Sequence, residues 1–221
     1  MQQILLKMGL LSMLVAPMFG GALIDFSGSM GGTITCTTPS TCTAASTITG
    51  SGIQISNMLV VGTPGGLEDG FYTVTSGRLN FTETGGVSAP PFLIISGSIT
   101  AGSCVSGCGA NANTVVVGAG NLLTGTAADT FSFTTLNNAI QVSGNGPDVK
   151  LGTLLTALNL VGFNWAFAGF TIGGVNVGGG VYNATSTDIG NNAVPEPASI
   201  LLLGTVLIGV TQVIRRRASK V

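Results

Sequence analysis

The sequence lacks histidine altogether and has very little charge. Lys and Arg supply seven of its 221 residues and Asp and Glu eight, so charged residues make up 7%, against roughly 25% in an average soluble domain. Without histidine, Ser-His-Asp triads, Cys-His dyads and His-ligated zinc are excluded. Four of the seven basic residues follow position 214, which excludes a basic nucleic-acid-binding surface. The net charge of −1 and 45% hydrophobic content exclude disorder driven by charge.

The N-terminus has the three parts of a secretory signal. Lys7 supplies a positive charge, an apolar run follows from Met8 to Ala16, and small residues surround Ala22. A short apolar run between a basic start and small residues is typical of a signal peptide. We therefore expect residues 1–22 to direct export and to be removed by cleavage after Ala22; a buried N-terminal helix is the alternative.

The C-terminus carries a second ordered pattern. Val194-Pro195-Glu196-Pro197 precedes an uncharged stretch over residues 198–214, and Arg215, Arg216 and Arg217 follow. As a helix this stretch would be roughly 26 Å long at 1.5 Å per residue, which is near the lower limit for crossing a membrane. The arginines would stay on the cytoplasmic side. We predict a membrane helix over 198–214; a core helix with a basic tail is the alternative.

In these residues the chain resembles the bacterial PEP-CTERM proteins, whose tail combines a Pro-Glu-Pro signature, a membrane helix and a basic end. The resemblance covers residues 193–219, the expected sorting segment. It implies export, inner-membrane anchoring through the helix, recognition of Val194–Pro197 by an exosortase, and then delivery to the cell surface or extracellular space. Such proteins are typical of bacteria that make exopolysaccharide and biofilms, but the tail says little about the task of the exported part.

Residues 23–192 are predicted to form one β-rich domain. It holds seven carboxylates against Arg78 and Lys150, a balance of −5. Short runs that alternate apolar and polar residues are separated by Gly and Asn clusters such as Gly144–Pro147, which indicates strands joined by turns. We expect an all-β fold, a single antiparallel β-sandwich or jelly-roll-like domain. One short helix is expected over Leu151–Leu158, capped by Asp148, and an Asn-rich linker is expected to lead into the sorting segment.

Four cysteines, Cys36, Cys42, Cys104 and Cys108, allow three pairings. Export favours their oxidation. We favour the local pairs Cys36–Cys42 and Cys104–Cys108, with cross-pairs and free thiols as the alternatives. The spacing lacks the paired C-x₂-C pattern of a zinc site, so no metal or other cofactor is expected.

Carboxylates give the sequence few candidates for chemistry. Glu68 or Asp69 could act with Glu83 as the two carboxylates of a glycoside hydrolase, but the Glu-Asp-Gly sequence is also typical of a solvated turn. Calcium could bind carboxylates in loops, and the candidates are Glu68, Asp69, Asp129 and Asp148. No Asp-x-Asp loop supports this hypothesis.

Rings and hydroxyls offer two further patterns. Phe163, Trp165 and Phe167 alternate along a predicted strand, so they form either a sugar-binding platform or part of the core. Isolated Thr-x-Thr pairs at Thr33–Thr35 and Thr73–Thr75 do not amount to a repeated ice-binding array.

These observations together predict an exported protein of the cell envelope or extracellular matrix, structural or associated with polysaccharide, and not an enzyme. The expected partners are an exosortase, the membrane and exopolysaccharide, with no nucleic acid. A carbohydrate- or calcium-binding surface module is the alternative, and an enzyme acting on polysaccharide is a third hypothesis.

Overall fold

The computed structural model describes residues 21–37, 42–43, 46–84, 92–126 and 130–194. Over these ranges the chain forms an 11-stranded sheet in which every pairing is antiparallel. The strands are β1 (Leu23–Gly28), β2 (Thr33–Cys36), β3 (Thr47–Val61), β4 (Gly70–Thr84), β5 (Leu93–Ile99), β6 (Cys104–Ser106), β7 (Val117–Gly125), β8 (Thr130–Leu136), β9 (Ala139–Lys150), β10 (Asn164–Gly178) and β11 (Val181–Val194).

Three short helical segments complete the described chain: η1 (Pro64–Gly66), η2 (Ala112–Thr114) and α2 (Gly152–Ala157). The all-β, antiparallel prediction is confirmed. Within the ranges that the structure describes, no helix is long and apolar enough to span a bilayer. Residues 1–20 of the predicted signal peptide, which spans 1–22, and the predicted membrane helix 198–214 lie outside these ranges.

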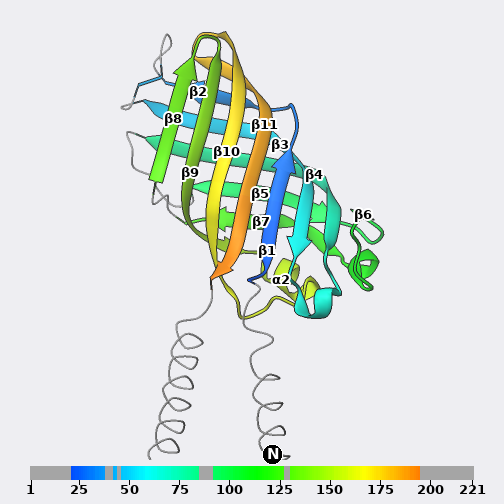
Figure 1. Cartoon of the computed structure of the whole chain (residues 1–221). Helices are drawn as coiled ribbons and strands as arrows, with labels where there is room; N and C mark the ends of the chain where they lie inside the picture. Colours follow the sequence, from blue (N-terminus) through cyan, green and yellow to red (C-terminus); the bar gives the residue numbers. More distant parts are fainter. Residues whose placement is uncertain (1–20, 38–41, 44–45, 85–91, 127–129, 195–221) are drawn as a thin grey trace, which may run out of the picture.

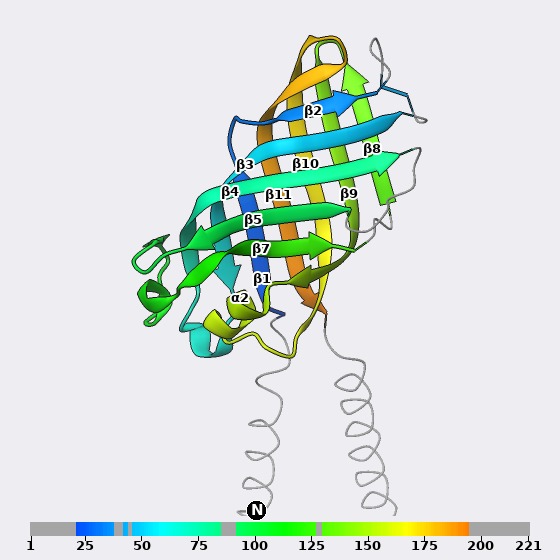
Figure 2. The ribbon, with the colours of Figure 1, turned by 180° about the vertical axis from the view of Figure 1, so that it is seen from behind.

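The sheet is continuous and its pairings return to their starting strand. β1 pairs with β3, and the ladder then runs through β4, β5, β7, β9, β10 and β11 before β11 pairs with β1 again. Figures 1 and 2 show two layers: β8, β9, β10, β11, β1 and the last part of β3, which pairs with β1, form one, and β2, the first part of β3, most of β4, β5 and β7 cross behind it. The described strands thus form one sheet, whose long strands pass between both layers, and not the two separate sheets of the predicted sandwich.

The long strands bend where their backbone departs from regular geometry. In β3, Gly52 has a positive φ of 61°, and the register with β4 shifts between Gly50 and Ile53. In β4, Ser76 has a φ of 54° and divides the two runs, Phe71–Thr75 and Arg78–Thr82, that the sequence suggests as separate strands. Such irregularities bend a strand and increase its local twist, which lets one strand serve two layers.

The Gly144–Pro147 segment is predicted as a turn, and this prediction is wrong. These residues lie within β9, whose first part pairs with β8 and β10, whereas Asp148 and Lys150 pair with β7. The same glycines that suggest a chain reversal instead allow a bend within a strand. The predicted Asn-rich linker is likewise wrong, because β11 continues to Val194 and is paired as far as that residue.

The core is apolar and lies between the two layers. Its largest fully buried side chains include Phe26, Tyr72, Phe92 and Phe170. Phe81, Phe92, Phe131 and Phe170 contact one another with ring centroids 5.7–6.4 Å apart; we call these four residues the phenyl cluster. Tilted and edge-on ring pairs of this kind add to the gain from burial alone.

The predicted short helix is present as α2, but its predicted cap is wrong. Leu151 occupies the N-cap position and makes no capping hydrogen bond through its side chain. Leu154 and Leu158 are buried, as their helical spacing predicts, and Leu155 packs against the core. Asp148 lies in β9, where its carboxylate pairs with Lys150. Asp148 therefore pairs with a buried lysine and does not form the helix cap that its spacing in the sequence predicts.

Candidate functional site

The chain enters and leaves the sheet at the same end. Leu23 of β1 pairs with Asn192 of β11, and the N–H of Ala193 donates to the carbonyl of Ala22 at 2.8 Å. Figure 1 shows the start of β1 and the end of β11 side by side, close to α2. β11 is hydrogen-bonded on both sides here, to β1 and to β10. The predicted sorting segment therefore follows a strand anchored on both edges.

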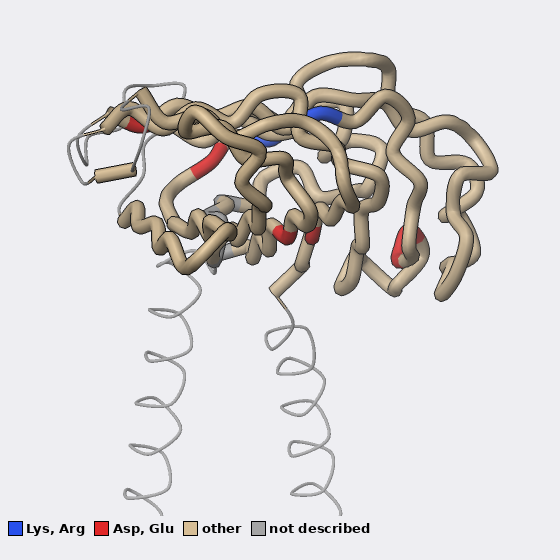
Figure 3. Tube along the Cα trace, turned by 90° about the horizontal axis from the view of Figure 1, so that it is seen from above, with Lys and Arg blue, Asp and Glu red and all other residues tan. Residues whose placement is uncertain are grey.

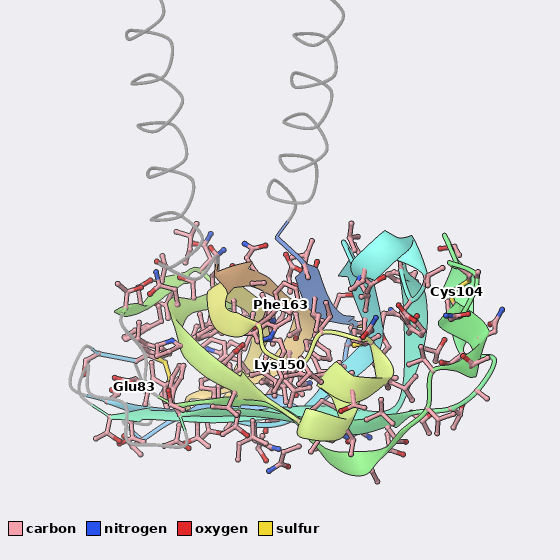
Figure 4. The ribbon with its side chains drawn as sticks, turned by 90° about the horizontal axis from the view of Figure 1, so that it is seen from below. Glu83, Cys104, Lys150 and Phe163 are labelled. Atoms are coloured by element: carbon pink, nitrogen blue, oxygen red, sulfur yellow. A yellow bond between two sulfur atoms is a disulfide. The ribbon has the colours of Figure 1, made fainter. Side chains whose placement is uncertain are left out.

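A buried polar group lies in the interior near this end. It consists of Asp148 and Lys150 on β9, Trp165 on β10 and Asn191 on β11, and we call it the lysine cluster. The Nζ of Lys150 donates to Oδ1 and Oδ2 of Asp148 at 2.9 and 3.0 Å and to Oδ1 of Asn191 at 3.4 Å. It also lies 4.3 Å from the centre of the Trp165 ring. Figure 4, viewed from this end, shows Lys150 near the middle of the fold.

The cluster is shielded from solvent. Lys150 is 4% exposed and Asn191 is fully buried. Burial lowers the pKa of Lys150 to about 8, although Asp148 opposes the shift. Burial raises the pKa of Asp148, with Lys150 opposing. The low polarity of the interior disfavours the charged forms of both groups. The pKa values of the Lys150 amine and the Asp148 carboxyl group are therefore closer together than in water.

Local strand geometry brings these groups together. Asp148 and Lys150 are two residues apart on β9, so both point inward, while Val149 between them is 59% exposed. Lys150 reaches past the ring of Trp165 on the intervening strand to Asn191. Asn191 is fixed by its own amide, which donates to the carbonyl of Ile189 at 3.1 Å. The three adjacent strands β9, β10 and β11 thus each contribute at least one side chain to the lysine cluster.

No sequence pattern predicts the lysine cluster. Asp148 is expected as a helix cap or calcium ligand and Asn191 as part of a linker, and Lys150 enters only the charge balance. One signal was available: opposite charges two residues apart in a strand of a domain that has only two cations, Arg78 and Lys150. The partner Asn191, 41 residues further along the chain, has no such signal.

A pair of like charges lies on the outer side of β1 and β11. Burial, and then the negative charge of Asp188, raise the pKa of Asp25 to about 6. Oδ1 of Asp25 is buried and has no hydrogen-bond partner among the described residues, and Asp188 is exposed. A hydrogen bond between the two side chains favours the protonated form of Asp25. No sequence pattern predicts that these two aspartates meet.

Glu68 and Asp69 hold the turn between β3 and β4. Asp69 accepts hydrogen bonds from the backbone N–H groups of Gly62 and Thr63 at 3.1 and 2.8 Å, and from the Thr63 hydroxyl at 2.7 Å. Glu68 accepts from the amide of Asn111 at 3.3 Å. These contacts confirm a turn at this motif, but the expectation that it is solvated is wrong for Glu68, whose side chain is buried.

Glu83 lies at the far end of β4 from Glu68 and Asp69. The strand Gly70–Thr84 separates them by about 45 Å along its length at roughly 3.3 Å per residue, whereas glycosidase carboxylates lie about 5–10 Å apart. The structure therefore does not bring this candidate pair together. Figure 4 shows Glu83 at the edge of the fold, and burial raises its pKa.

The remaining calcium candidates do not converge either. Asp148 pairs with Lys150, and Asp129 lies outside the described residues. In the described part of the chain, no three His, Cys, Asp or Glu side chains are grouped so that they could hold a metal ion. Figure 3 shows how few acidic residues the fold has and that most of them lie apart.

The proposed aromatic platform is divided between the interior and the surface. Trp165 is buried, with its ring over Lys150, whereas Phe163 is 40% exposed and lies 6.4 Å from Trp165 between ring centroids. The side chain of Phe167 lies outside what the structure describes. Trp165 is therefore not presented to a sugar in solution.

Both local disulfides are present. Cys36 bonds Cys42, and Cys104 bonds Cys108, so the favoured pairing is confirmed. The first is buried where β2 ends, next to Tyr182. The second lies at the surface beside Gly70, at one side of the view in Figure 4. Each closes a short loop outside the lysine cluster.

Comparison with protein families finds the PEP-CTERM protein-sorting motif at residues 193–218. The match confirms the resemblance of the tail and begins one residue before β11 ends. No curated protein and no solved structure matches the chain significantly. The motif indicates export, anchoring in a membrane before processing, and cleavage by an exosortase, which is itself a membrane protein.

Proposed function

We propose that the exported domain is a non-catalytic, structural component of the cell envelope or extracellular matrix, and that its weakly charged, hydroxyl-rich outer face binds neutral polysaccharide. The sorting motif at residues 193–218 supports the destination. The proposed molecular role rests on the hydroxyl and amide groups of the exposed sheet surface.

That surface presents hydroxyl and amide groups in pairs across neighbouring strands. Thr47 and Thr84 are hydrogen-bonded at 3.0 Å, Ser132 and Ser143 at 2.9 Å, and Thr130 and the Asn145 amide oxygen at 2.9 Å. Such groups both donate and accept, as the hydroxyls of a sugar do. Binding of this kind depends weakly on salt because no ion pair is involved.

The binding proposal is tested with the full chain purified in detergent and the extracellular polysaccharide of the exporting cells. We expect the protein to sediment with the polysaccharide at both low and high salt. Binding lost at high salt would contradict recognition by uncharged groups, and binding that requires calcium would favour the calcium-dependent module. Release of reducing sugar ends during incubation would favour an enzyme and overturn the proposal.

The sorting proposal is tested separately by replacing Pro195, Glu196 and Pro197 with alanine and following the protein by cell fractionation. We expect the variant to stay in the membrane fraction because the exosortase no longer recognises it. Ser51→Ala, at an exposed position on β3, is the matched control and should be sorted normally. Unchanged release of the triple variant would show that these residues are not the recognition element.

A further inference from the structure

The lysine cluster places three groups of complementary reactivity in contact away from water. Nζ of Lys150 is a potential nucleophile, the side-chain amide of Asn191 is an acyl donor, and the carboxyl group of Asp148 can carry a proton. Nζ lies 2.9 and 3.0 Å from the two oxygens of Asp148 and 3.4 Å from Oδ1 of Asn191. The three residues are more than nine-tenths buried.

We propose that Lys150 and Asn191 form an intramolecular amide bond between Nζ and Cγ, with release of ammonia and with Asp148 as the catalytic residue that carries the proton. The bond would join β9 to β11 across β10. This inference does not depend on the polysaccharide-binding proposal, since it concerns only a reaction within the folded chain.

The first requirement of the reaction is a neutral amine. An ammonium has no free electron pair, so Lys150 must give a proton to Asp148 before it attacks. The interior favours this transfer because it exchanges two buried charges for two neutral groups. The lowered pKa of Lys150 and the raised pKa of Asp148 have the directions that this exchange needs.

The bond changes balance without any further reagent. The electron pair of Nζ forms the bond to Cγ of Asn191, and the bond between Cγ and Nδ2 breaks. One of the two protons on the neutral amine passes through Asp148 to Nδ2, which leaves as ammonia, and the other stays on the new amide. Protonation of ammonia once it reaches water makes the reverse reaction unfavourable.

The neighbouring groups position the reactants and exclude water. The ring of Trp165, 4.3 Å from Nζ, lies beside the lysine side chain. The hydrogen bond from Nδ2 of Asn191 to the Ile189 carbonyl fixes the amide, so that Oδ1 is directed at Lys150. Holding reacting groups in place in this way replaces a bimolecular encounter with a step inside one molecule.

The place of the bond gives it a mechanical consequence. Asn191 lies three residues before the end of β11, and the sorting motif begins at residue 193. A pull on the C-terminal segment is transmitted first to the last residues of β11, which hydrogen bonds alone hold to β10 and β1. A covalent bond to Lys150 would keep this end from peeling away from the sheet.

The test is a peptide map of the full-length chain after reduction and denaturation. Arg78 and Lys150 are the trypsin sites between residues 23 and 194, and trypsin does not cleave after a lysine whose Nζ is in an amide. We expect resistance at Lys150, and after digestion with a different protease, a branched peptide containing Lys150 and Asn191 that is lighter than its two parts by one ammonia. Separate, unmodified peptides would overturn the proposal. A loss of water between Lys150 and Asp148 would overturn it as well.

Variants test the role of each group. Asn191→Ala should abolish the branched peptide, whereas Asn192→Ala, at the exposed neighbouring position, should retain it. Asp148→Asn keeps the size of the side chain but removes the proton carrier, so the rate of bond formation should fall on the order of 100-fold. A cross-link in Asp148→Asn that forms as fast as in the wild type would contradict the role of Asp148. If a variant fails to fold, the peptide map of the wild type still decides whether the bond exists.

Discussion

Two regions of one interior contrast in chemistry. The phenyl cluster brings four rings from β4, β8, β10 and the residue before β5 into contact. The lysine cluster buries an ion pair, an amide and an indole between β9, β10 and β11. Both join strands of the same sheet. The rings need only to be close, whereas each polar group needs a partner in a particular direction.

The phenyl cluster and the lysine cluster therefore differ in what they contribute to the protein. Burial of apolar rings stabilises the fold directly. A buried ion pair is often no more stabilising than apolar side chains of similar size, because the charges lose their hydration. Since apolar side chains could fill the same space at similar stability, the placement of an amine beside an amide is better explained by specificity or reactivity than by the folding free energy.

The largest effect is expected from Phe170→Ala. Phe170 is buried and contacts three other rings, so its removal should lower the free energy of unfolding by about 4 kcal/mol through lost burial and a cavity. Phe163→Ala, at a residue that is 40% exposed, is the control and should cost much less. Urea unfolding measures both. Equal losses would show that the phenyl cluster is not the main apolar contact.

The second prediction concerns the lysine cluster. Lys150→Met leaves Asp148 buried without its cation, so this variant should be less stable by about 3 kcal/mol than the double variant Asp148→Leu, Lys150→Met. Neither variant can form the Lys150–Asn191 bond, so their difference reports on the unpaired carboxylate alone. If the two unfold at the same urea concentration, Asp148 is accommodated without Lys150.

The disulfides provide an intermediate effect outside both clusters. Each closes a loop of four to six residues, for which constraint of the unfolded chain contributes about 2 kcal/mol. Replacing Cys36 and Cys42 by alanine should cost more than replacing Cys104 and Cys108, since the first pair is buried and its removal also leaves a cavity. Calorimetry of both variants tests this order, and the reverse order would contradict it.

The smallest effect is expected for the like-charged pair on β1 and β11, in contrast to the opposite charges of the lysine cluster. The pKa of Asp25 is raised from 3.8 to about 6, so between these values the folded protein binds a proton that the unfolded chain does not. Its contribution to stability therefore falls as pH rises from about 4 to 6. Asp25→Asn should flatten this dependence and raise the melting temperature at pH 7. An unchanged pH profile would show that folding does not raise the pKa of Asp25.

Local patterns predicted much of the fold. Alternation identified β-structure, leucine spacing identified α2, and short cysteine separations favoured the observed disulfides. Predictions were wrong where a glycine- or asparagine-rich segment remains in a strand, at Gly144–Pro147 and at the end of β11. There the hydrogen bonds of neighbouring strands outweigh the local preference for a turn.

The sequence by itself determined the sorting tail, because its recognition depends on a contiguous order of Pro-Glu-Pro, apolar stretch and arginines. It also determined the β class through local alternation, and the short separations of the cysteines favoured the local disulfide pairs that the structure shows. Only the tertiary structure decided that Glu68 and Glu83 lie apart and that Lys150 meets Asn191. Contacts between residues so far apart in the chain depend on which strands pair and in what register, and a shift of one residue would point each side chain to the opposite face.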